Sequence, residues 1–428
     1  MVKLVWLTME WRIEDTPEQA EFRQGVRDWI ASQLPDAWVG AVEEGDDEAF
    51  ALARKEAEAN GWNPGSWMRI VGESGYAAPL WPEEYGGMGA DTWAPRIVRS
   101  EMEHHRLPTV FPNILGVGLA GPTIIAHGTD AQKERYLRKI LTGEEIWCQL
   151  FSEPGSGSDL ASVSTRAVRD GDEWVVNGQK VWTSVAQLSS FGMLLARTEP
   201  DKPKHEGLTY FIVDMRAPGV DIRPLRQLSG SAEFNEVYFT DVRVPTENVV
   251  GDIGDGWRVA RTTLMNERVA LSGVALDPVA FIGGTRRDPW SSFLSKIPDM
   301  SHAGTRQKVA QAYIEQQVKE ITAFRATAAR QRGDTPGPEG SIGKVFNATF
   351  NQWRSSFVMD VNGPAAVAWM PGDTEAESRA YTFLRARANS IEGGTSEILR
   401  NMIGERVLGL PREPEADKGV AWKDLSRS

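Results

Sequence analysis

The chain has 428 residues, a length that favours two or three domains over a single core. A net charge of −12 excludes broad electrostatic attraction to nucleic acid or anionic lipid, and no apolar run approaches the ~18 residues of a membrane span. The single cysteine, Cys148, excludes an internal disulfide and favours a reducing, cytoplasmic compartment. The five histidines show no spacing typical of metal ligands, so we expect no metal site.

Residues 1–145 are predicted to form a mainly helical domain. Thr16-Pro17-Glu18-Gln19 has the form of a helix start, with an N-cap residue, a proline in the first turn and an acidic residue beside it. Apolar residues then recur at helical spacing from Phe22 to Leu34. A loop rich in proline and glycine covers residues 75–87. Further helices are expected at Arg96–His105, Pro122–His127 and Ala131–Thr142.

From residue 146 to residue 252 the pattern changes to short alternating strands separated by turns. Strands at this spacing, with no helices between them, favour a small antiparallel β-barrel or sandwich. Gly171-Asp172 is a dipeptide typical of a tight hairpin turn. The expected strands are Arg166–Asp170, Glu173–Asn177, Phe191–Arg197, Leu208–Asp214, Val220–Pro224 and Val237–Val244.

Residues 253–412 are predicted to be helical again. The last helix is expected to open at Gly394-Thr395-Ser396-Glu397 and to stop at Gly409-Leu410-Pro411, a usual stop signal. Residues 413–428 form a tail that we expect to be loose. The other expected helices are Trp257–Leu276, Arg306–Arg332 and Ser341–Val361.

Two segments of the middle region carry the clearest chemical signal. Glu153–Asp159 packs two glycines and two serines into a loop, which can expose backbone N–H groups and hydroxyls to an acceptor-rich ligand. Trp182 stands beside Thr183 and Ser184, so a flat aromatic face lies next to small donors and suits a planar heterocycle. Loops of this composition are more often simple turns, and the loop alone is therefore weak evidence.

Taken together and in this order, the two segments resemble the acyl-CoA dehydrogenase family of flavoproteins. The order helical, β, helical extends the resemblance from about Thr16 to Pro411. It implies an α+β multidomain fold with an N-terminal helical domain, a middle antiparallel β-barrel or sandwich and a C-terminal four-helix bundle. It also implies an FAD cofactor, for which the matching positions are Gln149, Leu150, Phe151, Ser152, Gly157, Ser158, Trp182, Thr183, Ser184, Arg306, Gly363, Thr395 and Glu397.

The resemblance implies an α,β-dehydrogenation of an acyl-CoA thioester to a trans-2-enoyl-CoA. The α-hydrogen leaves as a proton and the β-hydrogen as a hydride to flavin N5. Such a reaction needs a base with a raised pKa and hydrogen-bond donors at the thioester oxygen. The implied substrate contacts are Ser158, Arg268 and Gly393.

The identity of the base is the main open point in the sequence. The family usually places a glutamate immediately before Gly394-Thr395, where this chain has Gly393, and Glu392 stands one residue early. A minority of the family draws its glutamate from the helix after the barrel, which corresponds to Glu267 here. A surface ion pair between Glu267 and Arg268 is the ordinary alternative. The glycine at 393 favours Glu267 as the base, with Arg268 shaping the pocket.

Two departures concern the adenosine end of FAD. The family often supplies an Arg-x-x-Phe-Gly motif from a neighbouring subunit, and this chain has none around Asp288–Arg306, although Arg306 can serve. A glycine-rich segment on a later helix is reduced to Val361-Asn362-Gly363-Pro364. The adenosine end is then held differently, or by a different chain. Some relatives that act on bulky substrates, including steroid side-chain CoA esters, are heteromeric in this way.

The resemblance implies three partners: an acyl-CoA, an electron acceptor such as an electron-transfer flavoprotein, and further subunits in a homotetramer or a heterotetramer with a related chain. Glycines at 393 and 394 favour a branched or bulky acyl group. Two alternatives remain open. One is a flavin monooxygenase or nitroalkane oxidase of the same fold. The other is a non-catalytic subunit that shares FAD with a related chain. The intact Ser152–Asp159 segment makes this second alternative the weaker one.

Overall fold

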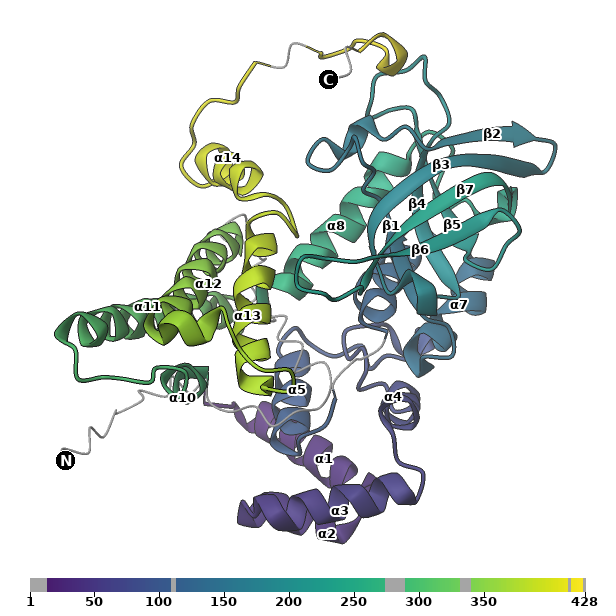
Figure 1. Cartoon of the computed structure of the whole chain (residues 1–428). Coiled ribbons are helices and arrows are strands. Elements are labelled where there is room, and N and C mark those ends of the chain that lie inside the picture. The colour runs from purple at the N-terminus through teal and green to yellow at the C-terminus, as the bar shows by residue number, and fades with distance from the viewer. Residues whose placement is uncertain (1–13, 109–112, 274–288, 332–339, 415–416, 426–428) are drawn as a thin grey trace.

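The computed structural model describes residues 14–108, 113–273, 289–331, 340–414 and 417–425 of the chain. Helices at both ends of the sequence flank a curled β-sheet, and helix α8 (Gly256–Gly273) runs between the sheet and the C-terminal helices (Figure 1). This arrangement confirms the predicted fold class. The N-terminal helices are α1 (Pro17–Gln33), α2 (Asp36–Glu44), α3 (Asp47–Ala59), α4 (Pro64–Glu73), α5 (Ala94–His104), α6 (Gly121–His127) and α7 (Asp130–Thr142).

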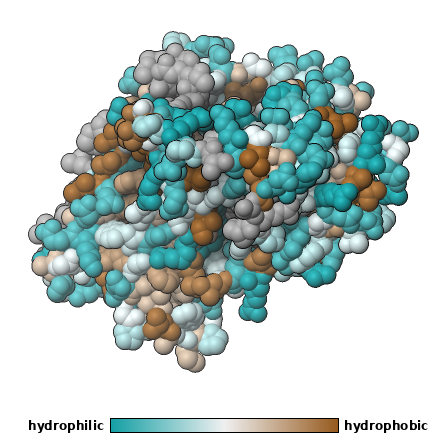
Figure 2. Space-filling view, turned by 90° about the horizontal axis from the view of Figure 1, so that it is seen from above, coloured by the Kyte–Doolittle hydropathy of each residue, from teal (hydrophilic) through white to brown (hydrophobic). Residues whose placement is uncertain are grey.

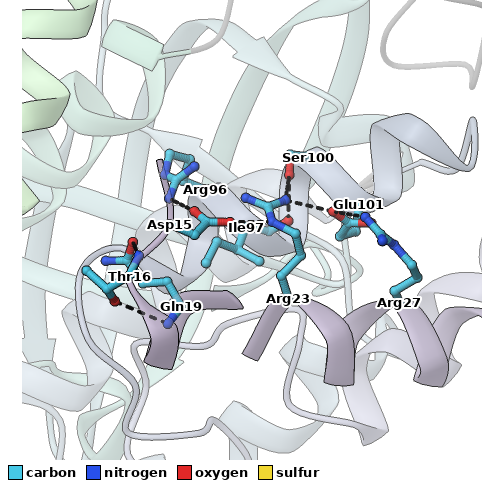
Figure 3. Close-up of polar contacts among 9 residues, drawn as sticks. All are labelled: Asp15, Thr16, Gln19, Arg23, Arg27, Arg96, Ile97, Ser100 and Glu101. Carbon is cyan, nitrogen blue, oxygen red and sulfur yellow. Dashed lines mark hydrogen bonds and ion pairs between the residues drawn. The ribbon is translucent and has the colours of Figure 1, made fainter. Parts of the chain in front are cut away.

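Helix α1 begins where the sequence predicts, because Thr16 forms a capping box with Gln19. A cluster of ion pairs then fixes α1 on α5 (Figure 3). Arg23 reaches Glu101 at 2.7 Å, Arg27 reaches it at 3.1 Å, and Arg96 pairs with Asp15 at 2.8 Å. Burial alone would raise the pKa of Glu101, but the two arginines hold this pKa below its usual range. The charged cluster therefore anchors the first helix of the N-terminal domain.

The middle region forms one seven-stranded sheet in the order β1-β4-β2-β3-β7-β6, with β5 paired to β4. Most neighbours are antiparallel, whereas β4 pairs in parallel with β1 and, at one residue, with β2. The predicted hairpin is present, since Asp170 faces Glu173 across a turn in which Gly171 has φ +64°. The strands are β1 (Trp147–Leu150), β2 (Arg166–Asp170), β3 (Glu173–Ser184), β4 (Phe191–Arg197), β5 (Leu208–Asp214), β6 (Val220–Leu225) and β7 (Phe234–Pro245).

Helix α8 is docked onto the sheet and the N-terminal helices by buried hydroxyls. Thr263 lies 3.1 Å from the Tyr210 hydroxyl of β5 and Thr123 of α6 lies 2.9 Å from Thr263. Both contacts are side chain to side chain, so they fix the rotation of α8 about its axis. The remaining C-terminal helices are α10 (Pro289–Leu294), α11 (Ala303–Gln331), α12 (Gly340–Asn362), α13 (Thr374–Ala386) and α14 (Ser396–Arg406).

The prediction of a loose C-terminal tail is wrong for residues 417–425. The chain leaves α14 and returns to the β-domain, where the Trp422 backbone N–H donates to the Lys202 carbonyl at 2.9 Å (Figure 1). The Trp422 ring also covers the Arg197 guanidinium at 4.7 Å. An aromatic anchor and backbone pairing therefore hold a segment whose composition is mostly polar.

In the described part of the chain, no helix combines the length and the apolar character that crossing a bilayer requires. The surface seen from above mixes hydrophilic residues with several separate apolar patches (Figure 2).

Candidate active site

A buried ion pair joins the two segments that the sequence singles out. Lys180 of β3 is fully buried, and its ammonium donates to the Glu153 carboxylate at 2.8 Å. The same ammonium donates to the backbone carbonyls of Phe151 and Leu195 at 2.9 and 2.8 Å. Lys180 therefore connects residues 153–159, called the serine–glycine loop below, to the strand that carries Trp182.

The loop end of this pair is held by further donors. The Glu153 carboxylate accepts hydrogen bonds from the backbone N–H groups of Ser164 at 2.7 Å and Thr165 at 2.9 Å. Burial alone would raise the pKa of Glu153, but Lys180 and these donors lower it to about 2. Burial lowers the pKa of Lys180, and the Glu153 charge opposes that shift. Glu153 and Lys180 therefore form an ion pair that is buried away from solvent.

Neither Glu153 nor Lys180 is among the residues predicted for the site. The period-2 alternation of β3 contains the missed signal, because Trp174, Val176 and Lys180 all fall on its inward face. A lysine on a buried face requires an acid partner, and Glu153 is the acid at the start of the loop.

Trp182 is presented outward by an irregularity in β3. The pairing of β3 with β7 shifts register between Lys180 and Thr183, and Trp182 itself has φ +61°. This left-handed conformation is uncommon for a bulky residue and is typical of a functional constraint. The indole is 55% exposed and rests edge-on against Phe234 at 5.8 Å. A flat aromatic face thus stands open beside the loop.

The groups around this face fit a flavin. The Thr183 hydroxyl is buried without a hydrogen-bond partner. The hydroxyls of Ser152, Ser158 and Ser184 enter no side-chain hydrogen bond among the described residues. A Cβ at Gly157 would meet no atom within 4 Å, so the loop is open at this point. An exposed ring, donors that are not already engaged and an open glycine loop match the two polar parts of FAD, its planar isoalloxazine ring system and its pyrophosphate.

Two predicted cofactor contacts lie deeper than the others. The side chains of Leu150 and Phe151 are buried in the core, where Phe151 packs edge-on against Tyr210 at 5.9 Å. Only their backbone groups can therefore reach a ligand.

Glu267 lies on α8 and is half-buried rather than solvent-facing. Its carboxylate accepts a hydrogen bond from the Gln149 amide of β1 at 3.2 Å. Gln149 is itself a predicted cofactor contact, so this bond brings the predicted base to the predicted flavin segment. The side chain of Arg268 lies outside the described residues.

The last loop places Glu392 in a structural role. Its carboxylate accepts from Arg385 and from Asn389, each at 2.7 Å. Gly393 has φ +62°, a conformation that favours glycine over glutamate. The Lys344 ammonium donates to the Gly394 carbonyl at 2.6 Å. The loop is therefore braced by Glu392, whose two oxygens are both engaged.

Four predicted cofactor residues stand apart from the Trp182 face. Thr395 caps α14 by accepting from the Ile398 N–H, and the exposed Glu397 pairs with Arg400. Arg306 donates to the carbonyls of Met300 and Ser301, and Gly363 follows α12 with φ +54°. Within the described residues, none of Arg306, Gly363, Thr395 and Glu397 forms a hydrogen bond or ion pair with residues 149–158 or 182–184.

Family models agree with the three-part architecture. The model of the acyl-CoA dehydrogenase N-terminal domain matches residues 16–144, that of the middle domain matches residues 148–242, and that of the C-terminal domain matches residues 254–408.

Several curated relatives and solved structures are similar over most of the chain. Acyl-CoA dehydrogenase IpdE1 of Mycobacterium tuberculosis is 38% identical over 397 residues, which cover 92% of this chain and 98% of that protein. Acyl-CoA dehydrogenase FadE34 of the same organism is 40% identical over 345 residues, which cover 80% of this chain, and this chain spans 46% of its length.

Among solved structures, the ChsE4-ChsE5 complex from Mycobacterium tuberculosis has a TM-score of 0.70 at 30% identity, covering 94% of this chain and 100% of that one. The Tcur3481-Tcur3483 steroid ACAD has a TM-score of 0.71 at 28% identity, covering 94% and 99%. Three matching domains in the expected order and a relative that is 38% identical over 98% of its own length lead to one conclusion. The chain belongs to the acyl-CoA dehydrogenase family of oxidoreductases.

Proposed function

We propose that this chain is an FAD-dependent acyl-CoA dehydrogenase in which Glu267 removes the α-proton of the thioester. The hydrogen bond between Glu267 and Gln149 is the observation that carries the proposal, because it ties the carboxylate of α8 to the strand that leads into the serine–glycine loop. The engagement of Glu392 by Arg385 and Asn389 supports the same choice, since it leaves that carboxylate committed to the loop.

The cofactor site is proposed to consist of an aromatic wall and a donor loop. Trp182 would stack against the flavin ring, and the hydroxyls of Ser184 and Ser158 would donate to its polar edge and to the phosphates. Bound FAD would supply the acceptor for the β-hydrogen and its electron pair. Water exclusion at this face would strengthen each of these hydrogen bonds.

The proton step is assigned to the half-buried Glu267. When Glu267 removes the α-proton, the electron pair left behind moves toward the thioester oxygen, where donors must stabilise the developing charge. We assign one donor to the backbone in the Gly393 loop, which Lys344 and Glu392 hold in place. Arg268, one residue beyond Glu267, is proposed to line the substrate pocket.

The substrate is proposed to be a CoA ester with a branched or ring-bearing acyl group. Gly393 and Gly394 leave two neighbouring positions of the last loop without a side chain, and the similar solved structures include one named as a steroid ACAD. An electron-transfer flavoprotein would accept the electrons. The unpaired, buried Cys148 is typical of a reducing compartment, and we place the enzyme in the cytoplasm.

The assembly is proposed to be a tetramer, formed either by this chain alone or with a related chain. Helix α11 exposes Ile314 and Val318 at 55% and 50%, an apolar face that a neighbouring subunit would cover. Two of the similar structures are named as pairs of chains, which supports the heteromeric form.

The visible spectrum of the purified protein tests the proposal. We expect a flavin band that bleaches when a CoA ester is added without oxygen. A panel of straight, branched and ring-bearing esters should show faster bleaching with the bulky members. A protein that takes up no flavin even after FAD is added would contradict the proposal and favour a partner subunit. A bound flavin band that none of the esters bleaches would favour the oxidase or monooxygenase chemistry.

A further inference from the structure

The C-terminal segment Asp417–Leu425, called the strap below, lies against the β-domain rather than against the helices that precede it (Figure 1). It pairs with the loop between β4 and β5. The Trp422 N–H donates to the Lys202 carbonyl at 2.9 Å, and the Lys423 N–H donates to the Pro200 carbonyl at 3.0 Å. These backbone bonds fix the register of the strap on the loop.

Trp422 connects the strap to the far end of the serine–glycine loop. Its indole N–H donates to the Ser162 carbonyl at 3.3 Å. Its ring covers the guanidinium of Arg197, which is 1% exposed and donates to the Ala161 carbonyl at 2.5 Å. Ala161 and Ser162 belong to the short helical turn that follows the loop directly. Trp422 of the strap thus contacts both this turn and Arg197, the residue that holds the turn in place.

Asp417 adds a second connection through Lys204. The Lys204 ammonium lies 2.7 Å from Asp417 and 3.2 Å from Asp159, the last residue of the loop. Asp159 in turn accepts from the Ser162 hydroxyl at 2.6 Å. Partial burial opposes the charge on Lys204, but the two aspartates raise its pKa above the usual range. One lysine therefore links the strap and the loop.

The opposite end of the loop is held by Lys180, which pairs with Glu153. Between these two ends lie Gly155 and Gly157, where an added Cβ would meet nothing within 4 Å. Because glycine adds conformational freedom to the backbone, fixing both ends of this segment limits the shapes that it can adopt.

We propose that the strap is a positioning segment for the cofactor loop, which fixes its Asp159–Ser162 end so that Gly157 and Ser158 are held ready for the FAD phosphates. This inference rests on the proposed function. A loop that must be ordered on binding lowers the observed affinity, whereas a loop that is already ordered does not.

Amide hydrogen exchange of the FAD-free protein tests the strap without the cofactor. The comparison uses the full chain, a chain ending at Pro414, Trp422→Ala and the control Lys418→Ala. The Lys418 side chain is exposed and forms no hydrogen bond or ion pair among the described residues. We expect faster exchange at residues 160–165 in the shortened chain and in Trp422→Ala, with Lys418→Ala unchanged. Unchanged exchange in the shortened chain would overturn the proposal.

FAD affinity provides the second measurement. In the shortened chain the dissociation constant should rise about tenfold, as expected from losing a shielded cation–π contact and an ion pair. Trp422→Phe keeps the ring and should recover most of the affinity, and a synthetic peptide of residues 415–428 added to the shortened chain should do the same. If the affinity loss only follows a lower melting temperature of the FAD-free protein, the strap is merely structural. A full chain that binds no FAD would contradict the proposed function, while the exchange experiment still decides the role of the strap.

Discussion

Replacing Lys180 by Met removes the charge that holds the serine–glycine loop to β3. The change leaves the Glu153 carboxylate buried against the N–H groups of Ser164 and Thr165 without its countercharge. The pKa of Glu153 falls from 4.5 to about 2 in the folded protein, and this shift corresponds to roughly 3 kcal/mol. Part of that shift comes from the Ser164 and Thr165 donors, which the variant keeps. Breaking one partner of a buried pair typically costs ~3–5 kcal/mol, and we therefore expect a loss of about 3 kcal/mol in the free energy of unfolding.

The stability difference between the natural protein and Lys180→Met should depend on pH, and the pKa of Glu153 gives the direction of that dependence. Because the folded pKa of Glu153 lies below its unfolded value, its stabilising contribution is fully present above pH 4.5 and is lost as the pH falls toward 2. In Lys180→Met the pKa of Glu153 in the folded protein rises. Protonating Glu153 at low pH therefore destabilises the variant less than it destabilises the natural protein. The gap in stability between the natural protein and the variant should therefore narrow as the pH is lowered from 7 to 4.

Urea unfolding followed by tryptophan fluorescence measures this free energy. The double variant Glu153→Gln/Lys180→Met should be more stable than Lys180→Met alone, since no buried charge is left unpaired. Lys202→Met is the matched control, because the Lys202 side chain is half-exposed and, among the described residues, forms an ion pair with the nearby Glu199 alone. Its loss should cost less than ~1 kcal/mol. A loss in Lys180→Met as small as that of the control would refute the reasoning.

Three further changes test other parts of the account. Trp182→Ala should weaken FAD binding by about tenfold or more through loss of a stacking face, with flavin fluorescence as the measurement; unchanged affinity would contradict the proposed wall. Glu392→Gln should leave turnover within a few-fold of normal, because its carboxylate braces a loop; a loss of several orders of magnitude would make Glu392 the base. Glu101→Gln should lower the free energy of unfolding by ~2 kcal/mol at pH 7, measured by urea denaturation, because Arg23 and Arg27 lose a buried partner. That loss should shrink as the pH falls below 4.5. The arginines hold the pKa of Glu101 below its usual range, so its stabilising contribution is fully present above pH 4.5 and is lost as the pH falls toward the lowered pKa.

Much of the fold could be predicted because its local signals agree with its tertiary contacts. The capping box at Thr16 and the N-cap at Thr395 start α1 and α14 where the sequence indicates. Strand alternation gave β2, β4 and β5 with their observed bounds. The strand β3 is longer than predicted, since it continues through Gly178 and the irregularity at Trp182, where simple alternation fails.

Helices α2, α3, α4, α10 and α13 were not among the predicted helices, and α4 and α13 illustrate two different reasons. Helix α4 opens with Pro64-Gly65, a pair that resembles a loop, yet Asn63 caps it and Trp67 and Val71 pack into the core. Helix α13 buries few of its residues, so its apolar period is weak and its position depends on packing against α12.

Contacts between distant segments are beyond the reach of local patterns. The pairing of Glu153 with Lys180 and the docking of Trp422 on Arg197 join residues that are far apart in the chain. Glu267 could be named because the glycine at 393 leaves the usual position empty, but its contact with Gln149 depends on how α8 is rotated by Thr263. Sequence reasoning therefore named candidate chemical groups and missed Glu153, Lys180 and Trp422, whose contacts hold the loop next to them.

Anaerobic mixing of the FAD-loaded Glu267→Gln variant with an acyl-CoA that reduces the natural protein tests the central claim most directly. The variant should keep its flavin band and its hydrogen bond to Gln149, because glutamine preserves the shape of the side chain. Its rate of bleaching should fall by about 10²–10⁴-fold, the contribution of a positioned general base. Bleaching at the natural rate would show that another group takes the α-proton.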